Sequence, residues 1–467
     1  MVQPGSPGIT SIHEFHPQFT YPIFGEEERI FGYKGLEIDL KFATHDLRPN
    51  AIVSYDKRFP TVGSTSAFDI HKALKEFLPA EAFVKEADYD RAIHEDQSTQ
   101  AFTPPGKLIN TYTRKGRTFE IWAGSLLDPA VRKIVDRMQV FISLFIEAGT
   151  PINTKDFDWT LDRWRLYFIY EKATPPTPSA SPYSFVGYST TYRFFTIKPT
   201  PIPLFSDATK QGSIAPNTLP SRVRISQFLV LPPYRQLGHG SAMYQAIYAE
   251  IIRDPTVFEL SVEDPSEEFD KLRDVNDWKV LEPEFRKADI KINVAVDTHR
   301  LKRMPTAKLL KLEAIKAIRA THKIASRQFA RQLEMYLLSL VPFSRRAAGG
   351  ANMTTLMIKK SRAADPNDKA YYWWRLILKQ RIFKKNRTLL QQMDLEERIP
   401  KVDESARAQE DEYEILLLAY ATAAARDAGL LNGSGSSALS ERKRKVVDDD
   451  DDDEDAGEPK RARSEVL

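Results

Sequence analysis

The chain has 467 residues, enough for two to four domains of about 150 residues each, and 42% of them are hydrophobic. It has no cysteine, which excludes disulfide bonds, thiolate zinc sites and a cysteine nucleophile, and its 8 histidines leave little room for a histidine-rich metal centre. The net charge of +3 conceals a segregation, because residues 300–390 hold 22 Lys and Arg against 4 Asp and Glu, whereas the rest of the chain holds 45 basic and 60 acidic residues.

The sequence predicts a soluble intracellular protein without membrane contact. Its longest nearly continuous apolar run, Ile415 to Ala425, is too short to cross a bilayer. The N-terminal MVQPGSPGIT lacks the basic and apolar regions of a secretory signal.

Residues 1–125 are predicted to form a mixed α/β domain. The alternation of apolar and polar residues over Leu36–Phe42 is typical of a half-buried strand, and Thr118–Trp122 is a second strand candidate. Helices are expected over Ala67–Phe77 and Ala80–Lys85.

Residues 126–285 are predicted to form a central domain. Asp128 caps a strong helix over Ala130–Ala148, and two antiparallel strands follow at 164–172 and 184–197.

The most informative stretch of the chain alternates strands, loops and helices. A strand over Arg224–Leu231 leads into the loop RQLGHG and a helix over Ser241–Arg253. A second strand, Val257–Val262, ends in Glu263-Asp264, and a helix over Ser266–Asn276 follows. A right-handed crossover between parallel strands brings the glycine loop and the two carboxylates to one edge of a sheet.

The glycine loop is a candidate anion site. The first N–H groups of a helix lack internal partners and lie at the positive end of its dipole, and glycine lets a phosphate approach them. An ordinary tight turn is the alternative, and Arg235 in the loop could contact phosphate or be solvated.

The R-x-x-G-x-G loop resembles the acetyl-CoA motif of the GNAT acetyltransferases. More closely, RISQFLVLPPYRQLGHGSAMY and VFELSVEDPSEEFDKLRD resemble the type B histone acetyltransferase catalytic subunits, as do FGYKGLEIDL, FIEAGT and DRWRLYFIYEK. The resemblance spans roughly residues 10–340. It implies an α/β GNAT fold and acetyl transfer from acetyl-CoA, with no metal, to lysines in the N-terminal tail of newly made, free histone, mainly histone H4.

The resemblance also implies site residues. Acetyl-CoA contacts fall on Phe228, Leu229, Val230, Arg235, Gln236, Leu237, Gly238, His239, Gly240, Ser241, Ser266 and Phe269. The catalytic base corresponds to Glu263, with Asp264 and Glu147 as supporting carboxylates. Contacts with the histone tail correspond to Glu26, Glu27, Glu28, Trp164, Tyr192, Arg193 and Phe194.

Two positions depart from the family pattern. Tyr192-Arg193-Phe194 replaces a more usual Tyr-Asn-Tyr-like run, so Arg193 is not expected to read the substrate in the same way. Phe269 lies where many GNAT enzymes place a tyrosine acid, which leaves the proton donor to the thiolate unidentified.

The chemistry of these residues suits direct transfer. A lysine ammonium is rarely neutral at pH 7, and a carboxylate such as Glu263 can remove its proton while backbone N–H groups near Leu229 and Val230 polarise the thioester carbonyl. The alternatives are that Glu263-Asp264 only caps the next helix and that Trp164, Tyr192 and Phe194 are core residues. His239 is expected to be structural. The acidic majority suits a basic peptide, or is an ordinary solvated surface.

Residues 286–430 are predicted to form a basic helical domain, with helices over Thr306–Ala320, Thr321–Leu340 and Asp403–Ala428. Its Lys and Arg interleave with Tyr371, Tyr372, Trp373 and Trp374, so a nucleic-acid surface is an alternative to ordinary helix faces.

The tail at 431–467 is predicted to be disordered, with RKRK at 442–445 and KRAR at 460–463 resembling a two-part nuclear import signal. The resemblance implies a WD-repeat histone-binding partner, and we expect the protein in cytoplasm and nucleus. A GNAT enzyme for another amine and a non-enzymatic chromatin-binding module are the rival functions.

Overall fold

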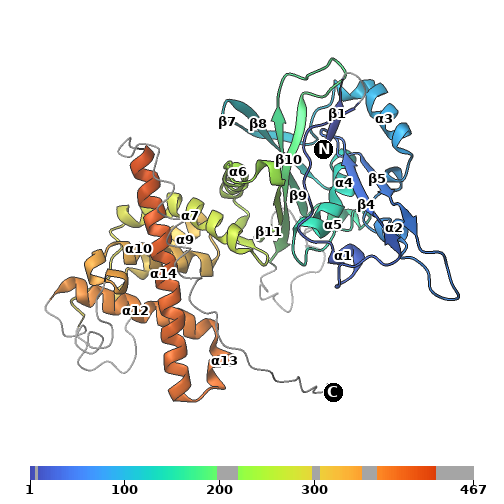
Figure 1. The fold of residues 1–467 in the computed structure, drawn as a ribbon. Helices are drawn as coiled ribbons and strands as arrows, with labels where there is room; N and C mark the ends of the chain where they lie inside the picture. Colours follow the sequence, from blue (N-terminus) through green and yellow to red (C-terminus); the bar gives the residue numbers. More distant parts are fainter. Residues whose placement is uncertain (6–8, 197–218, 297–305, 350–364, 428–467) are drawn as a thin grey trace, which may run out of the picture. The chain divides into compact units, whose positions relative to one another are not determined.

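The computed structural model describes residues 1–5, 9–196, 219–296, 306–349 and 365–427 (Figure 1). The chain divides into two compact units, Met1–Leu337 and Leu338–Leu467. The predicted domain boundaries at residues 125 and 285 stay predictions. The predicted tail and its two basic clusters lie outside the described residues. Among the helices in the described ranges, none is long and apolar enough to span a bilayer.

The first unit is built around a six-stranded sheet with strand order β12-β11-β10-β9-β8-β7. Its strands are β7 (Lys107–Arg114), β8 (Arg117–Ser125), β9 (Trp164–Lys172), β10 (Tyr183–Phe195), β11 (Ser221–Val230) and β12 (Val257–Val262). All neighbours are antiparallel except β11 and β12, which are parallel, as the predicted crossover requires. The strands predicted in this region are confirmed within a few residues.

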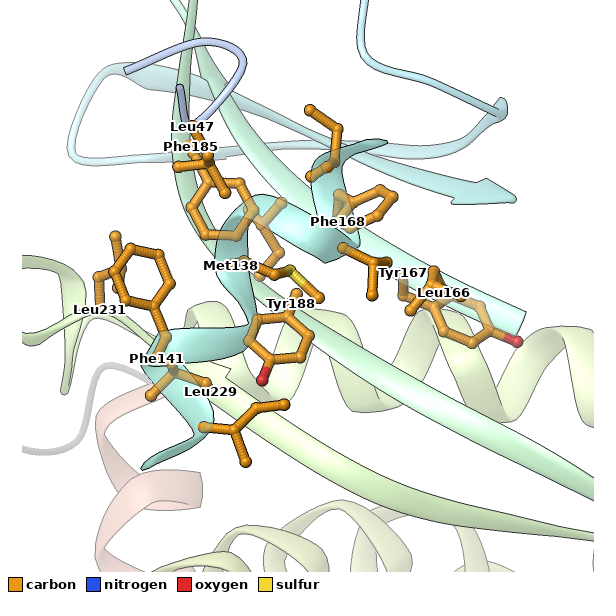
Figure 2. Packing of buried hydrophobic residues seen from close by; sticks show 14 of the residues in the cluster. Leu47, Met138, Phe141, Leu166, Tyr167, Phe168, Phe185, Tyr188, Leu229 and Leu231 are labelled. Carbon is orange, nitrogen blue, oxygen red and sulfur yellow. The ribbon is translucent and has the colours of Figure 1, made fainter. Parts of the chain in front are cut away.

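Two helices, α4 (Pro129–Phe145) and α6 (His239–Arg253), cover opposite faces of this sheet (Figure 1). The carboxylate of Asp128 accepts a hydrogen bond from the N–H of Ala130 at 2.8 Å, which confirms the predicted cap of α4. Figure 2 shows Met138 and Phe141 of α4 packed among core residues of the sheet. Helix α4 ends at Phe145, three residues before the predicted helix end at Ala148. Ala148 has a left-handed backbone with φ 53°, which does not continue the helix.

Short elements precede the sheet. They are the strand pairs β1 (Val2–Pro4) with β2 (Ile9–Ser11), β3 (Tyr33–Lys34) with β6 (Lys57–Arg58) and β4 (Glu37–Phe42) with β5 (Pro49–Ser54), and the helices α1 (Tyr21–Phe24), α2 (Ile70–Leu74) and α3 (Glu86–Glu95). The strand predicted at Leu36–Phe42 is confirmed as β4.

The helices predicted over 67–77 and 80–85 are wrong in extent. Asp69 caps α2, which leaves Ala67 outside the helix and confines α2 to five residues. Ala80–Ala82 form a single 3-10 turn, and Phe83 leaves helical geometry. A short helix forms few backbone hydrogen bonds to offset the cost of starting it, so its length depends on packing against the rest of the protein.

Helices α7 (Glu267–Lys287), α8 (Thr306–Leu309), α9 (Leu312–His322) and α10 (Ser326–Ser339) follow the sheet. The helix predicted over Thr321–Leu340 is interrupted at Lys323, whose φ is 54°. The ammonium of Lys323 donates to the carbonyls of Ile251 and Asp254 at the end of α6, at 2.9 and 2.6 Å. Its own carbonyl accepts from the N–H of Leu260, at 2.6 Å, so this segment lies against the edge of β12.

The second unit is helical, with α12 (Pro366–Lys385), α13 (Arg387–Gln391) and α14 (Leu395–Asp427). Tyr371, Trp373 and Trp374 of α12 are buried, so they form core rather than a surface on which bases could stack. Buried Arg375 pairs with Glu410 of α14 at 2.6 Å. The predicted mixed α/β fold class with a helical C-terminal region is confirmed.

Candidate active site

The end of β11 is paired on one side only. Its pairing with β12 stops at Ile225, whereas its pairing with β10 continues to Val230. The N–H of Gln227 donates to the Thr190 hydroxyl of β10 at 3.1 Å. Because strand residues alternate in direction, the backbone groups of Phe228 and Val230 point to the side that β12 has left. We call residues 226–230 the β11 extension.

The glycine loop connects the β11 extension to α6. Gly238 has φ +87°, a left-handed conformation that favours glycine. Helix α6 begins directly after it, at His239, two residues before the predicted helix start at Ser241. A Cβ at Gly238 would lie 3.2 Å from Nε of Arg114, at the end of β7. The loop therefore combines exposed backbone at a helix N-terminus with a neighbouring guanidinium.

Gly240 lies where α6 packs against α7. A Cβ at this position would lie 2.6 Å from Cδ1 of Leu272, a residue of α7. One turn further along α7, Asn276 donates to the Ser241 hydroxyl at 3.2 Å. Gly240 therefore allows α6 to pack closely on α7, and its predicted contact with the cosubstrate stays a prediction.

His239 is a buried residue at the start of α6. Its Nδ1 lies 2.8 Å from the hydroxyl of Tyr112, and its ring packs edge-on against Phe119. Burial, assisted by the positive charges of Arg114 and Arg117, lowers the pKa of His239 to about 4. The imidazole is therefore neutral at pH 7 and acts as a packing residue under the loop.

Other predicted cosubstrate residues are dispersed around this loop. Arg235 folds back and donates from Nε to the carbonyl of Val230 at 3.1 Å. The rings of Phe228 and Phe269 pack edge to face, with centroids 4.9 Å apart. Leu229 is buried in the core, whereas Gln236 has a left-handed backbone with φ 60°.

Glu263 follows β12 directly, beside the point where β11 and β12 separate. Its N–H donates to the carbonyl of Ile225 at 2.9 Å, and its exposed carboxylate pairs with Arg224 at 3.3 Å. The next helix is capped by Ser266, whose hydroxyl accepts from the N–H of Phe269 at 3.3 Å. Glu263 and Asp264 are therefore not the cap of α7, and this alternative for the carboxylate pair is wrong.

Glu147 lies in the exposed turn after α4, which reaches the same part of β11. The side chain of Gln227 donates to the carbonyl of Thr150 at 2.9 Å. The backbone N–H of Glu263 is hydrogen-bonded to the carbonyl of Ile225, which lies two residues before Gln227 on the same strand. The turn carrying Glu147 and the residue Glu263 thus flank the start of the β11 extension.

The acidic run at 26–28 follows α1. Oε1 of Glu28 accepts from the N–H and the hydroxyl of Thr20, at 2.9 and 2.8 Å, and these hydrogen bonds lower the pKa of Glu28. Glu28 therefore shapes the start of α1, whereas Glu26 and Glu27 are exposed. The hydroxyl of Tyr21 lies 3.4 Å from the N–H of Ala148, which connects α1 to the turn that carries Glu147.

Three predicted aromatic residues meet on one face of the sheet. The rings of Trp164 and Tyr192 are 4.8 Å apart, as are those of Tyr192 and Phe194. The guanidinium of Arg224 lies 4.4 Å from the centroid of Phe194 and pairs with Glu263. We call Trp164, Tyr192, Phe194, Arg224 and Glu263 the cross-strand row.

Arg193 is not part of this row. Because side chains alternate along β10, Arg193 points to the opposite face from Tyr192. There it pairs with Asp254 at 2.5 Å and donates to the hydroxyls of Ser221 and Thr256 at 3.2 and 3.0 Å. Its contacts join β10 to the turn before β12, which is a structural role.

Sequence reasoning missed three residues of this region. Arg224 and Gln227 lie inside the motif RISQFLVL, where polar residues in an otherwise apolar strand were an available signal. Arg114 lies more than a hundred residues before the loop that it adjoins, and nothing local marks it. Across the described part of the chain, no group of three or more His, Asp or Glu side chains could hold a metal ion.

Comparisons of the sequence with family models and curated proteins agree on one family. A model described as "Histone acetyl transferase HAT1 N-terminus" matches residues 2–147, and one described as "Fungal HAT1, C-terminal" matches residues 292–341. The histone acetyltransferase type B catalytic subunit of Aspergillus fumigatus is 51% identical over 89% of this chain and 75% of its own. The proteins of the same description from Aspergillus oryzae and Emericella nidulans are 50% and 46% identical, over 90% and 89% of this chain and 84% and 86% of theirs.

Proposed function

The chain belongs to the family of type B histone acetyltransferase catalytic subunits, and from this premise we propose which histone it modifies and how. It is a histone acetyltransferase. Its substrate is the N-terminal tail of free, newly made histone, mainly histone H4, and its acetyl donor is acetyl-CoA. The lysine amine attacks the donor directly, with Glu263 as the general base.

The observation that carries this proposal is the position of Glu263 beside the β11 extension. The backbone of Phe228 and Val230 points away from β10 at this place, and Glu263 is anchored to the same strand through Ile225. A base and a row of polar backbone groups therefore share one edge of the sheet. Removal of a proton from an amine and polarisation of a carbonyl beside it require such a pair.

The residues at this edge fit acetyl-CoA. The N-terminus of α6 and the guanidinium of Arg114 suit phosphate groups, and the backbone of Phe228 and Val230 suits the amide groups of a pantetheine arm. When bound, acetyl-CoA supplies the acetyl group as a thioester. Phe269 lacks a hydroxyl, so this side chain does not protonate the leaving thiolate.

Glu263 has a defined task in this reaction. A lysine ammonium has a reference pKa of about 10.4, so forming the free amine at pH 7 costs roughly 4–5 kcal/mol. A carboxylate placed against Nζ accepts that proton and offsets part of the cost. Arg224 contacts one oxygen of Glu263, at 3.3 Å, and so orients the carboxylate.

The surroundings of Glu263 suit a cationic, flexible peptide. Trp164, Tyr192 and Phe194 offer apolar faces to the methylene groups of a lysine, and aromatic faces also attract its ammonium. Glu26, Glu27 and Glu147 are exposed carboxylates on two connected segments, and their potential favours a basic tail.

The same proposal includes a partner and a location. A WD-repeat histone-binding subunit presents the histone, and the enzyme works in the cytoplasm and the nucleus, with the basic clusters at 442–445 and 460–463 as the import signal. Support for these points is the family resemblance and the tail sequence. We do not assign nucleic-acid binding to α12, because Tyr371, Trp373 and Trp374 are buried.

The test is transfer of labelled acetyl groups to free histones by the wild type, Glu263→Gln and the control Glu267→Gln. Glu267 is an exposed carboxylate in the first turn of α7, four residues away. We expect Glu263→Gln to lower kcat at least roughly tenfold at pH 7, because a general base contributes about 10²–10⁴. Glu267→Gln should retain full activity.

Three outcomes would contradict the proposal at different points. Equal rates for Glu263→Gln and wild type would remove Glu263 as the base. Equal transfer to all free histones would remove the preference for H4. Faster transfer to nucleosomes than to free histones would remove the assignment to newly made histone.

A further inference from the structure

A cavity of about 430 Å³ lies along the N-terminal half of α4, lined by residues of this helix and of two loops. Four of its lining side chains are cations, Arg132, Lys133, Arg137 and Lys155, and two are carboxylates, Glu81 and Asp136. None of these residues belongs to the glycine loop or to the cross-strand row. The cavity is thus separate from the candidate active site and has an excess of positive charge.

Both carboxylates in the cavity are already engaged. Glu81 accepts from Nε of Arg137 at 2.6 Å, and Arg137 also pairs with buried Asp46 at 2.6 Å. Asp136 accepts from the hydroxyl of Thr154 at 2.5 Å. Arg137 is therefore neutralised by carboxylates, and Asp136 is held by a neutral neighbour.

The other three cations lack this compensation. Among the described residues, no carboxylate lies within 4.0 Å of the charged groups of Arg132, Lys133 or Lys155. Arg132 donates weakly to the carbonyl of Leu127, at 3.4 Å, and its buried Nε–H has no acceptor among the residues that the structure describes. The guanidinium of Arg132 therefore keeps hydrogen-bonding capacity beyond this one weak contact.

We propose that this cavity binds a phosphate-bearing small molecule. A phosphate carries up to two negative charges and three acceptor oxygens, which match a guanidinium fork with two ammonium groups beside it better than a single carboxylate does. The cavity volume lies in the range of small-molecule sites, and the positive end of the α4 dipole adds to the attraction. The same charges repel the basic tail of a histone, so the cavity does not extend the substrate site.

The test is calorimetric titration of the full chain with sodium pyrophosphate in the presence of one equivalent of coenzyme A. Coenzyme A fills the cosubstrate site, so that saturable binding of pyrophosphate reports a second site. The variants are Arg132→Gln with Lys133→Gln, and Lys155→Gln alone. Arg91→Gln is the control, because Arg91 is an exposed arginine on α3, outside the cavity lining.

We expect one pyrophosphate per wild-type chain, binding at least tenfold weaker in the double variant and about threefold weaker in Lys155→Gln. Binding to Arg91→Gln should equal that of wild type. A lack of saturable binding to wild type, or equal affinities in all four proteins, would overturn the proposal. Tighter and equally mutation-sensitive binding of a hexa-aspartate peptide would also overturn it, because the occupant would then be an acidic protein segment. Acetyl transfer to histones should be unchanged in Lys155→Gln without pyrophosphate, which keeps this result independent of the proposed base.

Discussion

The glycine loop and the cross-strand row are built in opposite ways. The loop, with the β11 extension and the start of α6, comes from one continuous stretch of chain, Ser226–Ser241. The row takes its five members from β9, β10, β11 and the end of β12. The first region therefore depends on local backbone conformation, whereas the second depends on the register of four strands. A mutation should affect one region while sparing the other.

The largest expected effect comes from straining the loop. In Gly238→Val, a β-branched residue must adopt φ +87°, and its side chain must lie against Arg114. We expect the KM for acetyl-CoA to rise at least roughly tenfold, because strain of about 1–3 kcal/mol displaces the helix N-terminus from its ligand. The KM for histone should change less than twofold, as measured by steady-state kinetics with each substrate varied in turn.

Gly63→Val is the matched control for this loop variant. Gly63 also has positive φ, at +61°, but nothing lies within 4 Å of its missing side chain, and it is far from the loop in the sequence. Both variants should lose stability, with Tm lowered by a few degrees. A rise in the KM for acetyl-CoA in both would show that general destabilisation, not loop geometry, causes the effect.

A smaller effect is expected from the cross-strand row, with the reverse selectivity. Tyr192→Leu removes the ring contacts with Trp164 and Phe194, and aromatic pairs of this kind contribute about 0.5–1.5 kcal/mol. We expect the KM for a histone H4 tail peptide to rise about fivefold. The KM for acetyl-CoA should stay unchanged in the same assay.

The neighbouring residue provides the control for the row. Arg193→Gln removes the ion pair with Asp254 on the opposite face of the sheet. Burial alone would raise the pKa of Asp254, but hydrogen bonds from Thr256 and Arg193 lower it to about 2. The variant should lower Tm and leave both KM values within twofold of wild type. A raised KM for histone in Arg193→Gln would place Arg193 in the substrate site, against its position on the sheet.

The two regions also differ in how far the sequence alone could predict them. The order of β11, loop, α6 and β12 follows from apolar runs and glycines, and these elements lie within three residues of their predicted ends. The aromatic residues of the row could be grouped only through the family resemblance, because the register that brings Trp164 to Tyr192 is a long-range property. No local pattern could have predicted that Arg224 pairs with Glu263 or that Arg114 reaches Gly238.

The sequence placed Gly240 correctly but did not reveal its packing partner. Gly240 was predicted at the helix start and lies there, and a Cβ at this position would lie 2.6 Å from Cδ1 of Leu272 in α7. A glycine motif records close approach without recording what approaches. The packing partner lies thirty-two residues later in the chain, so the motif alone could not predict it.

The smallest effect at pH 7 should come from replacing His239, which we expect to support the loop without contacting a ligand. Its role should appear instead in the pH dependence of the unfolding free energy. Its pKa is about 4 in the folded protein and near 6.5 in an unfolded chain, so the unfolded state binds more protons between these values. The stabilising contribution of neutral His239 is complete above pH 6.5 and is lost as the pH falls towards 4. We expect wild type to lose on the order of 2 kcal/mol more unfolding free energy over this interval than His239→Gln does. Urea unfolding at pH 7, 6, 5 and 4 measures the unfolding free energy of both proteins. The contribution of His13 and other titrating groups is common to both and cancels in the difference between them. Equal slopes in the two proteins would mean that the imidazole is not buried in its neutral form, and the loop would then have a titrating group at the phosphate end of the site.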